Sequence, residues 1–252
     1  MATRSQLWLQ AVARQVRQPH PQQIARTLLR MPWEAQAQQL VEATEQTTFA
    51  ELVAQAGSPE PGTLFGDLAR EAWNVRIDEQ LAIGLLVRIA RPQRIFEFGT
   101  FDGDTTRYLA QQAGEAAHVW TLDLPDEAFA ELHSGVAWFT GADVGRRFRG
   151  TPEVERITQL RADSTAYDFA ELAATMDLVF VDAGHDYEHV LHDSRVAFRL
   201  IKPGGYVLWH DYGSHWPGVV LAVQEICTAH GSVAKQVYDT ALAYACTPAQ
   251  AL

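Results

Sequence analysis

From residue 76 onward, short apolar runs that suit buried strands alternate with segments whose apolar residues recur at helical spacing. The strand-like runs cover residues 94–99, 118–123, 156–163, 177–182 and 206–211, and residues 232–247 are long enough for two more strands. Strands that alternate with helices form a mostly parallel sheet covered by helices on both faces. The pattern therefore predicts an α/β domain with a seven-stranded, mostly parallel sheet over residues 76–252.

The helices between these strands are bounded by residues that start or stop helices. We expect them at 77–90, 105–114, 169–176, 187–201 and 217–230. Gly114 closes the second of these, the Lys-Pro-Gly-Gly run at 202–205 stops the fourth and turns into a strand, and Pro217 suits the first turn of the last.

Residues 1–75 differ in character from the rest of the chain, because they are rich in Ala, Gln, Leu and Arg. Residues 7–16 and 34–44 have helical spacing, and Pro19, Pro21 and Pro32 punctuate the region. We therefore expect an N-terminal helical extension over 1–75. It could cap the main domain, cover the active site or form a contact in a homo-oligomer, and the sequence does not choose among these roles.

The composition excludes several classes of function. The formal net charge is −11, and the one basic cluster, Arg146, Arg147 and Arg149, is expected to be a solvated loop, so nucleic acid is a poor candidate partner. No apolar run reaches the length of a membrane span, and two cysteines make neither a disulfide framework nor a zinc site. We expect a cytoplasmic protein that acts on a small molecule.

Polar residues stand at the ends of the predicted strands. In parallel α/β sheets, ligands bind beyond the carboxyl ends of the strands, so polar groups there are candidates for function. The residues at these positions are Glu97, Asp123, Asp163, Asp182, His210 and Asp211. The sequence therefore predicts that they converge on one rim of the sheet.

The first strand runs into a glycine-containing loop at residues 97–106. Gly99 and Gly103 allow a tight turn and the close approach of a ligand to the backbone. Phe101 occupies the position of the middle glycine of a dinucleotide fingerprint, which argues against that function. The carboxylate of Glu97 would repel a pyrophosphate but suits a ligand that carries an ammonium and a sulfonium group.

The run Glu-Phe-Gly-Thr-Phe-Asp-Gly-Asp-Thr-Thr at 97–106 resembles motif I of class I S-adenosylmethionine-dependent methyltransferases, in the form found in catechol O-methyltransferase-like enzymes. The resemblance implies a Rossmann-like fold and S-adenosyl-L-methionine as cofactor. It also implies that Asp123 binds the ribose hydroxyls and that Asp163 and Ser164 lie near the adenine. The implied cofactor-binding residues are Glu97, Gly99, Thr100, Phe101, Asp102, Gly103, Thr105, Thr106, Asp123, Asp163, Ser164 and Asp182.

The ends of the fourth and fifth strands, residues 182–188 and 209–212, are similar to those of macrolide-sugar O-methyltransferases. That resemblance implies a magnesium ion held by Asp182, His210 and Asp211, with Asp182 and His185 as catalytic residues and His185 as general base. His210 departs from the family, which has a carboxylate there, and imidazole suits zinc, iron, nickel or copper better than magnesium. Magnesium without His210, a transition metal with it, and no metal all remain open.

The resulting hypothesis is metal-assisted methylation of a hydroxyl on a sugar, a phenol or a natural-product intermediate. Alternatives are metal-independent methylation of nitrogen or sulfur, a NAD-dependent oxidoreductase, and a cofactor-binding module without activity. Trp209, Tyr212 and Trp216 flank the His-Asp pair and could stack on an acceptor ring or form the wall of the pocket.

Overall fold

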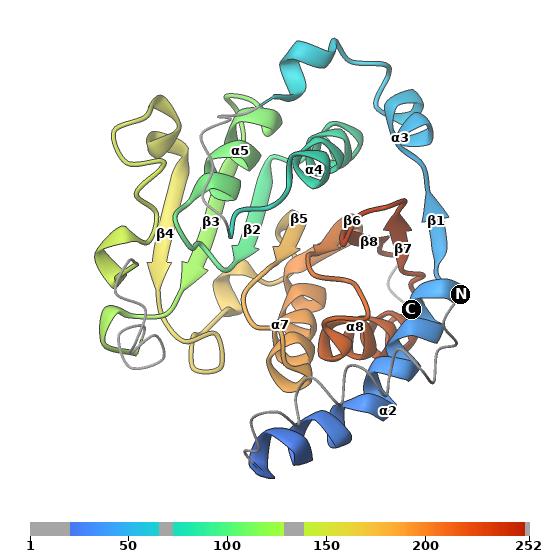
Figure 1. Cartoon of the computed structure of the whole chain (residues 1–252). Helices are drawn as coiled ribbons and strands as arrows, with labels where there is room; N and C mark the ends of the chain where they lie inside the picture. Colours follow the sequence, from blue (N-terminus) through green and yellow to red (C-terminus); the bar gives the residue numbers. More distant parts are fainter. Residues whose placement is uncertain (1–20, 66–72, 129–138, 250–252) are drawn as a thin grey trace.

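The computed structural model describes residues 21–65, 73–128 and 139–249. The helix predicted at 7–16 lies outside these residues. An eight-stranded sheet runs through the molecule in the order β1-β7-β8-β6-β5-β2-β3-β4, and every neighbouring pair is parallel except those of β8 with β6 and with β7 (Figure 1). This confirms the Rossmann-like α/β fold. The strands are β1 (Glu45–Thr47), β2 (Arg94–Phe98), β3 (His118–Asp123), β4 (Ile157–Arg161), β5 (Met176–Val181), β6 (Ile201–Trp209), β7 (Lys235–Val237) and β8 (Ala243–Cys246).

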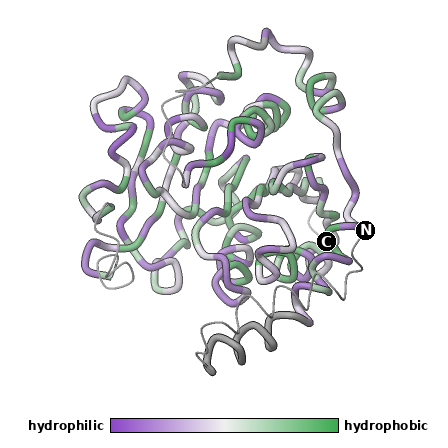
Figure 2. Tube along the Cα trace, in the orientation of Figure 1, coloured by the Kyte–Doolittle hydropathy of each residue, from purple (hydrophilic) through white to green (hydrophobic). Residues whose placement is uncertain are grey.

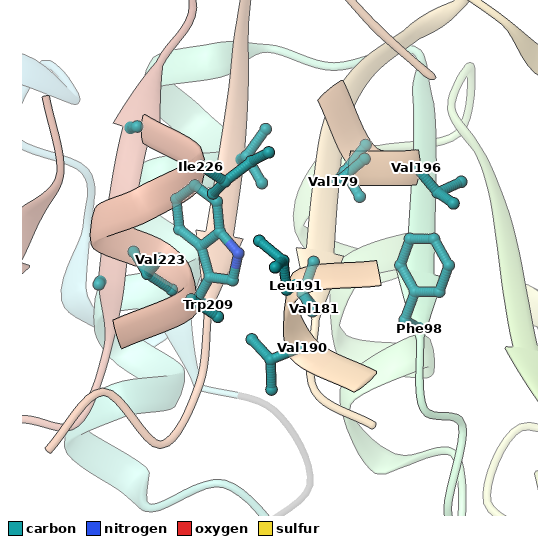
Figure 3. Close-up of a cluster of buried hydrophobic side chains, with 14 of the residues drawn as sticks. Phe98, Val179, Val181, Val190, Leu191, Val196, Trp209, Val223 and Ile226 are labelled. Carbon is teal, nitrogen blue, oxygen red and sulfur yellow. The ribbon is translucent and has the colours of Figure 1, made fainter. Parts of the chain in front are cut away.

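Helices cover both faces of the sheet. Side chains alternate along each strand, so Phe96 and Phe98 face one layer and Ile95 faces the other. Figure 3 shows the first layer, where Phe98, Val179 and Trp209 pack against helices α7 and α8, and Figure 2 shows hydrophobic stretches along α4 and α8. The helices are α2 (Pro21–Ala43), α3 (Phe49–Gln55), α4 (Ile77–Ala90), α5 (Asp104–Ala113), α7 (Tyr187–Leu200) and α8 (Pro217–Ala229).

The sheet has one strand more than the seven that the sequence predicts. The additional strand, β1, comes from the region that was expected to be wholly helical, and it pairs in parallel with β7. Three residues are too few for a pattern to show in the sequence. The Thr47 hydroxyl lies 2.8 Å from the Tyr244 hydroxyl and Lys235 Nζ lies 2.6 Å from Glu45 Oε1, and both contacts fix β1 at the sheet edge.

Two other expectations were wrong. Residues 169–176 form a single 3-10 turn (Ala170–Leu172) instead of a helix, because Phe169 inserts into the core and Met176 already begins β5. Residues 202–205 belong to β6, which starts directly after α7 and pairs with β5 through a register shift. Within the described residues, no helix combines the length and apolar character that crossing a membrane requires.

The strand order places a switch point between β2 and β5. These two strands are neighbours, and the chain continues from β2 to β3 on one side of the pair and from β5 to β6 on the other side. Such a switch point is where parallel α/β sheets bind ligands. The loops after β2, β5 and β6 therefore meet at one end of the sheet.

Trp209 anchors the end of β6 beneath α7. Its ring is fully buried, and its Nε1–H donates a hydrogen bond of 2.9 Å to the buried Ser194 hydroxyl. We expect Ser194→Ala to lower the free energy of unfolding by about 1–3 kcal/mol, because the buried indole N–H loses its acceptor. Urea unfolding measures this change. The control Thr228→Ala removes an exposed helical hydroxyl and should change stability by less than about 0.5 kcal/mol; equal effects would contradict the assignment.

Candidate active site

The loop after β2 approaches the end of β5 closely. Gly99 has φ +91°, and a Cβ at this position would lie 2.1 Å from the carbonyl oxygen of Asp182. The chain therefore requires glycine here for both backbone conformation and space. The contact brings the residues of motif I and the strand-end acid Asp182 into one site.

Glu97 is fully buried beside this contact. Its Oε2 accepts hydrogen bonds from the hydroxyls of Thr106 and, at 2.6 Å, Thr121, whereas Oε1 has no partner among the described residues. Burial raises the pKa of Glu97 to about 8, with smaller contributions from the charges of Asp182 and Asp123, although the two hydroxyls oppose the shift. The structure thus brings together three of the acids that the sequence predicted to converge, and it adds Thr121 to them.

Asp123 ends β3 and holds the glycine-containing loop. Its Oδ2 accepts backbone hydrogen bonds from Thr100 (3.1 Å) and Phe101 (2.9 Å), and its Oδ1 accepts one from Leu124 (2.8 Å). Burial raises the pKa of Asp123, although these backbone hydrogen bonds oppose it. The carboxylate lies at the predicted rim, and backbone N–H groups donate hydrogen bonds to both of its oxygens.

Asp102, predicted to bind cofactor, is buried and bound by protein groups. Its Oδ1 accepts hydrogen bonds from the Asn74 side chain and the Asp104 backbone, and its Oδ2 pairs with Arg147 Nε at 2.7 Å. Arg147 is largely buried, so the expectation of a solvated loop is wrong for this arginine. The ion pair fixes motif I to the segment around residue 147, where a Cβ on Gly103 would also meet the Phe148 ring at 2.6 Å.

The remaining predicted cofactor residues lie on the periphery. Thr105 is half-buried in the first turn of α5. Asp163 is exposed, and its Oδ1 accepts hydrogen bonds from the backbone and hydroxyl of Thr165, which shapes the turn after β4. The Ser164 carbonyl lies 3.1 Å from His192 Nε2 of α7. These residues border the rim without contacting Glu97.

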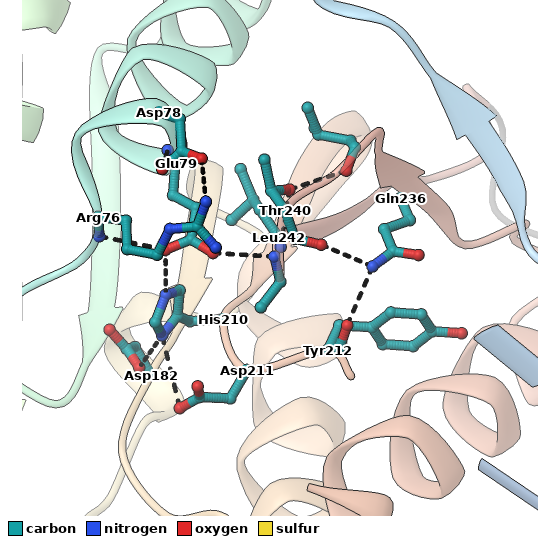
Figure 4. A network of polar contacts seen from close by, with 12 residues as sticks. Arg76, Asp78, Glu79, Asp182, His210, Asp211, Tyr212, Gln236, Thr240 and Leu242 are labelled. Atoms are coloured by element: carbon teal, nitrogen blue, oxygen red, sulfur yellow. Dashed lines mark hydrogen bonds and ion pairs between the residues drawn. The ribbon is translucent and has the colours of Figure 1, made fainter. Parts of the chain in front are cut away.

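The predicted metal ligands form one cluster. Atoms from Asp182, His210 and Asp211 lie within 4.8 Å of one another. His210 Nδ1 is 3.2 Å from Asp182 Oδ1 and 3.5 Å from Asp211 Oδ2 (Figure 4). Asp211 has φ +58°, a left-handed conformation that is costly for a residue other than glycine and is found at functional sites.

Sequence reasoning missed Glu79, which lies on the other side of His210. Glu79 is 1% exposed, and its Oε2 is 3.1 Å from His210 Nε2. The backbone N–H groups of Arg76 and Ala241 donate to the same carboxylate at 3.1 and 2.8 Å. The sequence shows only an acidic residue in the first turn of a predicted helix, and a helix cap would explain such a residue equally well.

In this cluster, burial and charge pairing shift the pKa values of the side chains in opposite directions. Burial alone would lower the pKa of His210, but the charges and hydrogen bonds of Asp182, Asp211 and Glu79 raise it well above its ordinary value. Burial would raise the pKa of Glu79 and of Asp211, yet their hydrogen bonds to histidine hold both below their usual ranges. The imidazole of His210 is therefore fixed between carboxylates at both of its nitrogens.

His185 follows β5 and faces Asp211. Its Nε2 is 2.7 Å from Asp211 Oδ2, and the ring stacks on Trp216 with centroids 4.3 Å apart. The hydrogen bond to Asp211 raises the pKa of His185. Of the three flanking aromatic residues, Trp209 and Tyr212 are fully buried, so only Trp216, 39% exposed, is open to an acceptor.

Comparison with known proteins finds a family model and relatives that each match part of the chain. Residues 96–212 match the model of a methyltransferase domain family. The chain is 28% identical over 145 residues to tricin synthase 1 of Oryza sativa and 25% identical over 154 residues to a flavonoid 3',5'-methyltransferase of Vitis vinifera, spanning 57% and 60% of this chain. It also matches an uncharacterized protein of Acanthamoeba polyphaga mimivirus, 29% identical over 76 residues, 29% of this chain. The chain covers 54%, 60% and 34% of these three relatives, respectively.

Solved structures share the fold. A Klebsiella pneumoniae protein provisionally assigned as an O-methyltransferase superposes with a TM-score of 0.54 at 18% identity, over 87% of this chain and 99% of its own. A Staphylococcus aureus protein provisionally assigned as a caffeoyl-CoA O-methyltransferase gives 0.52 at 14% identity, over 66% and 81%. At these identities the likeness is one of fold.

The match to a methyltransferase domain model over residues 96–212, the parallel sheet covered on both faces and the acidic rim at its switch point resemble those of class I, S-adenosylmethionine-dependent methyltransferases. The sequence of motif I and the acids after β5 and β6 are similar to those of the catechol O-methyltransferase-like branch.

The buried carboxyl of Glu97 leads to a prediction for ligand binding. With a pKa of about 8 it is protonated at pH 7, and the ammonium group of S-adenosylhomocysteine beside it would favour the ionised form. We expect binding at pH 7 to release about one proton to the buffer. Calorimetric titration in buffers of different ionisation enthalpy measures this release, which should vanish in Glu97→Gln. A wild-type heat that does not depend on the buffer would contradict the prediction.

Proposed function

We propose that this protein is an S-adenosylmethionine-dependent methyltransferase that transfers a methyl group to a hydroxyl of a small aromatic molecule, assisted by a divalent metal ion. The observation that carries the proposal is the clustering of ligand atoms from Asp182, His210 and Asp211 within 4.8 Å, with His185 directly beside Asp211. The two plant relatives support transfer to an aromatic hydroxyl, because one is named as a flavonoid methyltransferase and the other as tricin synthase.

The side chains of the cluster fit a metal ion. Bonds of about 2.1 Å place neighbouring donor atoms about 3.0–3.5 Å apart, and the distances from His210 Nδ1 to Asp182 and Asp211 are 3.2 and 3.5 Å. Asp182, His210 and Asp211 would hold the ion. When bound, it would supply a positive charge that lowers the pKa of a coordinated hydroxyl.

The methyl donor would lie on the opposite side of Asp182, along the loop after β2. Glu97 presents an oxygen without a partner among the described residues, and the charges of Asp182 and Asp123 act on the same carboxyl. This concentration of acidic groups suits a ligand that carries both an ammonium and a sulfonium. Gly99 lets the loop after β2 pack against the carbonyl of Asp182, and this close packing of the two loops would align donor and acceptor.

His185 would accept the proton of the acceptor hydroxyl. The hydrogen bond from its Nε2 to Asp211 holds the ring in place, and the nearby Asp211 carboxylate would stabilise the imidazolium that forms. Trp216 stacks on one face of the same ring and helps to hold it in place. Asp211 thus has two roles, because it faces both histidines of the site.

An exposed aromatic side chain beside the cluster favours an aromatic acceptor over a sugar. Trp216 stacks on His185, and it is 39% exposed. Exposed aromatic side chains beside a polar centre provide stacking surface for a planar ring.

The proposal predicts that donor binding and methyl transfer can be separated. Asp211→Asn should lower methyl transfer to a catechol by at least about 100-fold, because it weakens metal binding and releases His185. Its affinity for S-adenosylhomocysteine should stay within about twofold of wild type, since Asp211 lies away from Glu97. Transfer is measured with a radiolabelled donor, and donor affinity by calorimetry.

The control is Asp186→Asn, which removes an exposed carboxylate that follows β5, caps α7 and pairs with His189, and it should transfer at the wild-type rate. A wild-type rate of methyl transfer in Asp211→Asn, or full activity after chelation of metal ions, would contradict the metal-assisted mechanism. Full activity after chelation would favour the metal-independent alternative.

The acceptor can be tested at Trp216. Trp216→Leu should raise the KM for phenolic acceptors several-fold more than the KM for S-adenosylmethionine, because it removes the exposed ring at the rim. Steady-state kinetics with a catechol and with a deoxysugar separate the two acceptor classes. Turnover of the sugar alone would overturn the aromatic assignment.

A further inference from the structure

We propose that Glu79 is the positioning residue that turns His210 into a metal ligand, and that it thereby selects a nitrogen-binding transition ion over magnesium. The inference rests on the proposed metal site and goes beyond it, because it assigns a role to a residue of α4 and a chemical class to the ion.

The first support is the orientation of the imidazole. His210 Nε2 faces Glu79 Oε2 at 3.1 Å, so the other nitrogen, Nδ1, faces the carboxylates of Asp182 and Asp211 (Figure 4). A histidine ligand generally donates its second N–H to a carboxylate or carbonyl, which fixes the ring and its tautomer. The line from Glu79 through His210 to the two aspartates has this form.

The second support is the rigidity of Glu79 itself. Its side chain is 1% exposed, and two backbone N–H groups hold its oxygens, one from Arg76 at the N-cap of the same helix and one from Ala241, which is distant in the chain. A carboxylate that is fixed in this way cannot swing toward the cluster to become a ligand. It can only accept from Nε2, which leaves Nδ1 directed at the ion.

The third support is the chemistry of the donor set. Two carboxylate oxygens alone would suit magnesium, which prefers oxygen ligands and retains several waters. An imidazole nitrogen directed into the same space raises affinity for zinc, iron and cobalt and adds little for magnesium. Because Glu79 fixes that nitrogen in place, the site is built for a transition ion.

The experiment uses cobalt(II) as a probe, because it stands in for zinc or iron and is visible by absorption. We expect the full-length protein, saturated with S-adenosylhomocysteine, to bind Co2+ more tightly than Mg2+. Its proton NMR spectrum should contain a paramagnetically shifted, solvent-exchangeable imidazole N–H signal. Glu79→Gln should weaken Co2+ binding by about 10- to 100-fold and broaden or remove that signal, while Mg2+ binding changes little.

Two further variants guard against a folding artefact. Glu79→Asp keeps the charge but shortens the reach toward His210, so it should also weaken Co2+ binding. Asp78→Asn removes the neighbouring carboxylate on the same helix, which pairs with Arg76 and not with His210, and it should bind Co2+ as wild type does. Equal affinity for S-adenosylhomocysteine in all variants shows that the fold is intact.

The outcomes separate the two proposals. Unchanged Co2+ affinity in both Glu79 variants, or Co2+ bound without an imidazole signal, would overturn this inference and leave the metal-assisted function standing. Failure of the wild type to bind any of the ions, with transfer that persists after chelation, would overturn the metal-assisted function as well.

Discussion

The acidic end of the sheet depends on the contact between the loops that follow β2 and β5. Gly99 passes so close to the Asp182 carbonyl that no side chain could stand there. Because of this contact, the buried carboxyl of Glu97 and the strand-end carboxylate of Asp182 act on each other electrostatically. The proposed donor site and the proposed metal site belong to different strands, and this contact joins them in one acidic rim.

The acids of that rim have different kinds of hydrogen-bond partner. Glu97 is held by two threonine hydroxyls and its pKa rises, whereas Asp211 is held by two histidines and its pKa falls. Burial favours the neutral form of Glu97, and the two imidazoles favour the ionised form of Asp211. The same rim therefore has a protonated acid on the side of the proposed donor site and an ionised acid on the side of the proposed metal site.

The sequence predicted the sheet and most of the rim because long periodic segments and strand-end acids are local signals. The limits of β3, α4 and α5 follow from such patterns almost residue by residue. It could not predict β1, whose three residues gain their structure only by pairing with β7, nor the partners of Arg147, which depend on how an insertion folds back on motif I. The contact of Glu79 with His210 could not be predicted for the same reason, because the two residues are neighbours in space but lie 131 residues apart in the chain.

The edge strand β1 also connects the amino-terminal region to the candidate active site. Thr44, one residue before β1, shares a hydrogen bond of 2.7 Å with the hydroxyl of Tyr212, the residue that follows Asp211. The segment upstream of the family core is thus a structural component of the fold, and it cannot be trimmed as if it were an appendage. A shortened chain that starts at the family boundary would expose the open edge of β7 to pairing with other molecules, and it would release the loop that carries Asp211 from one of its supports.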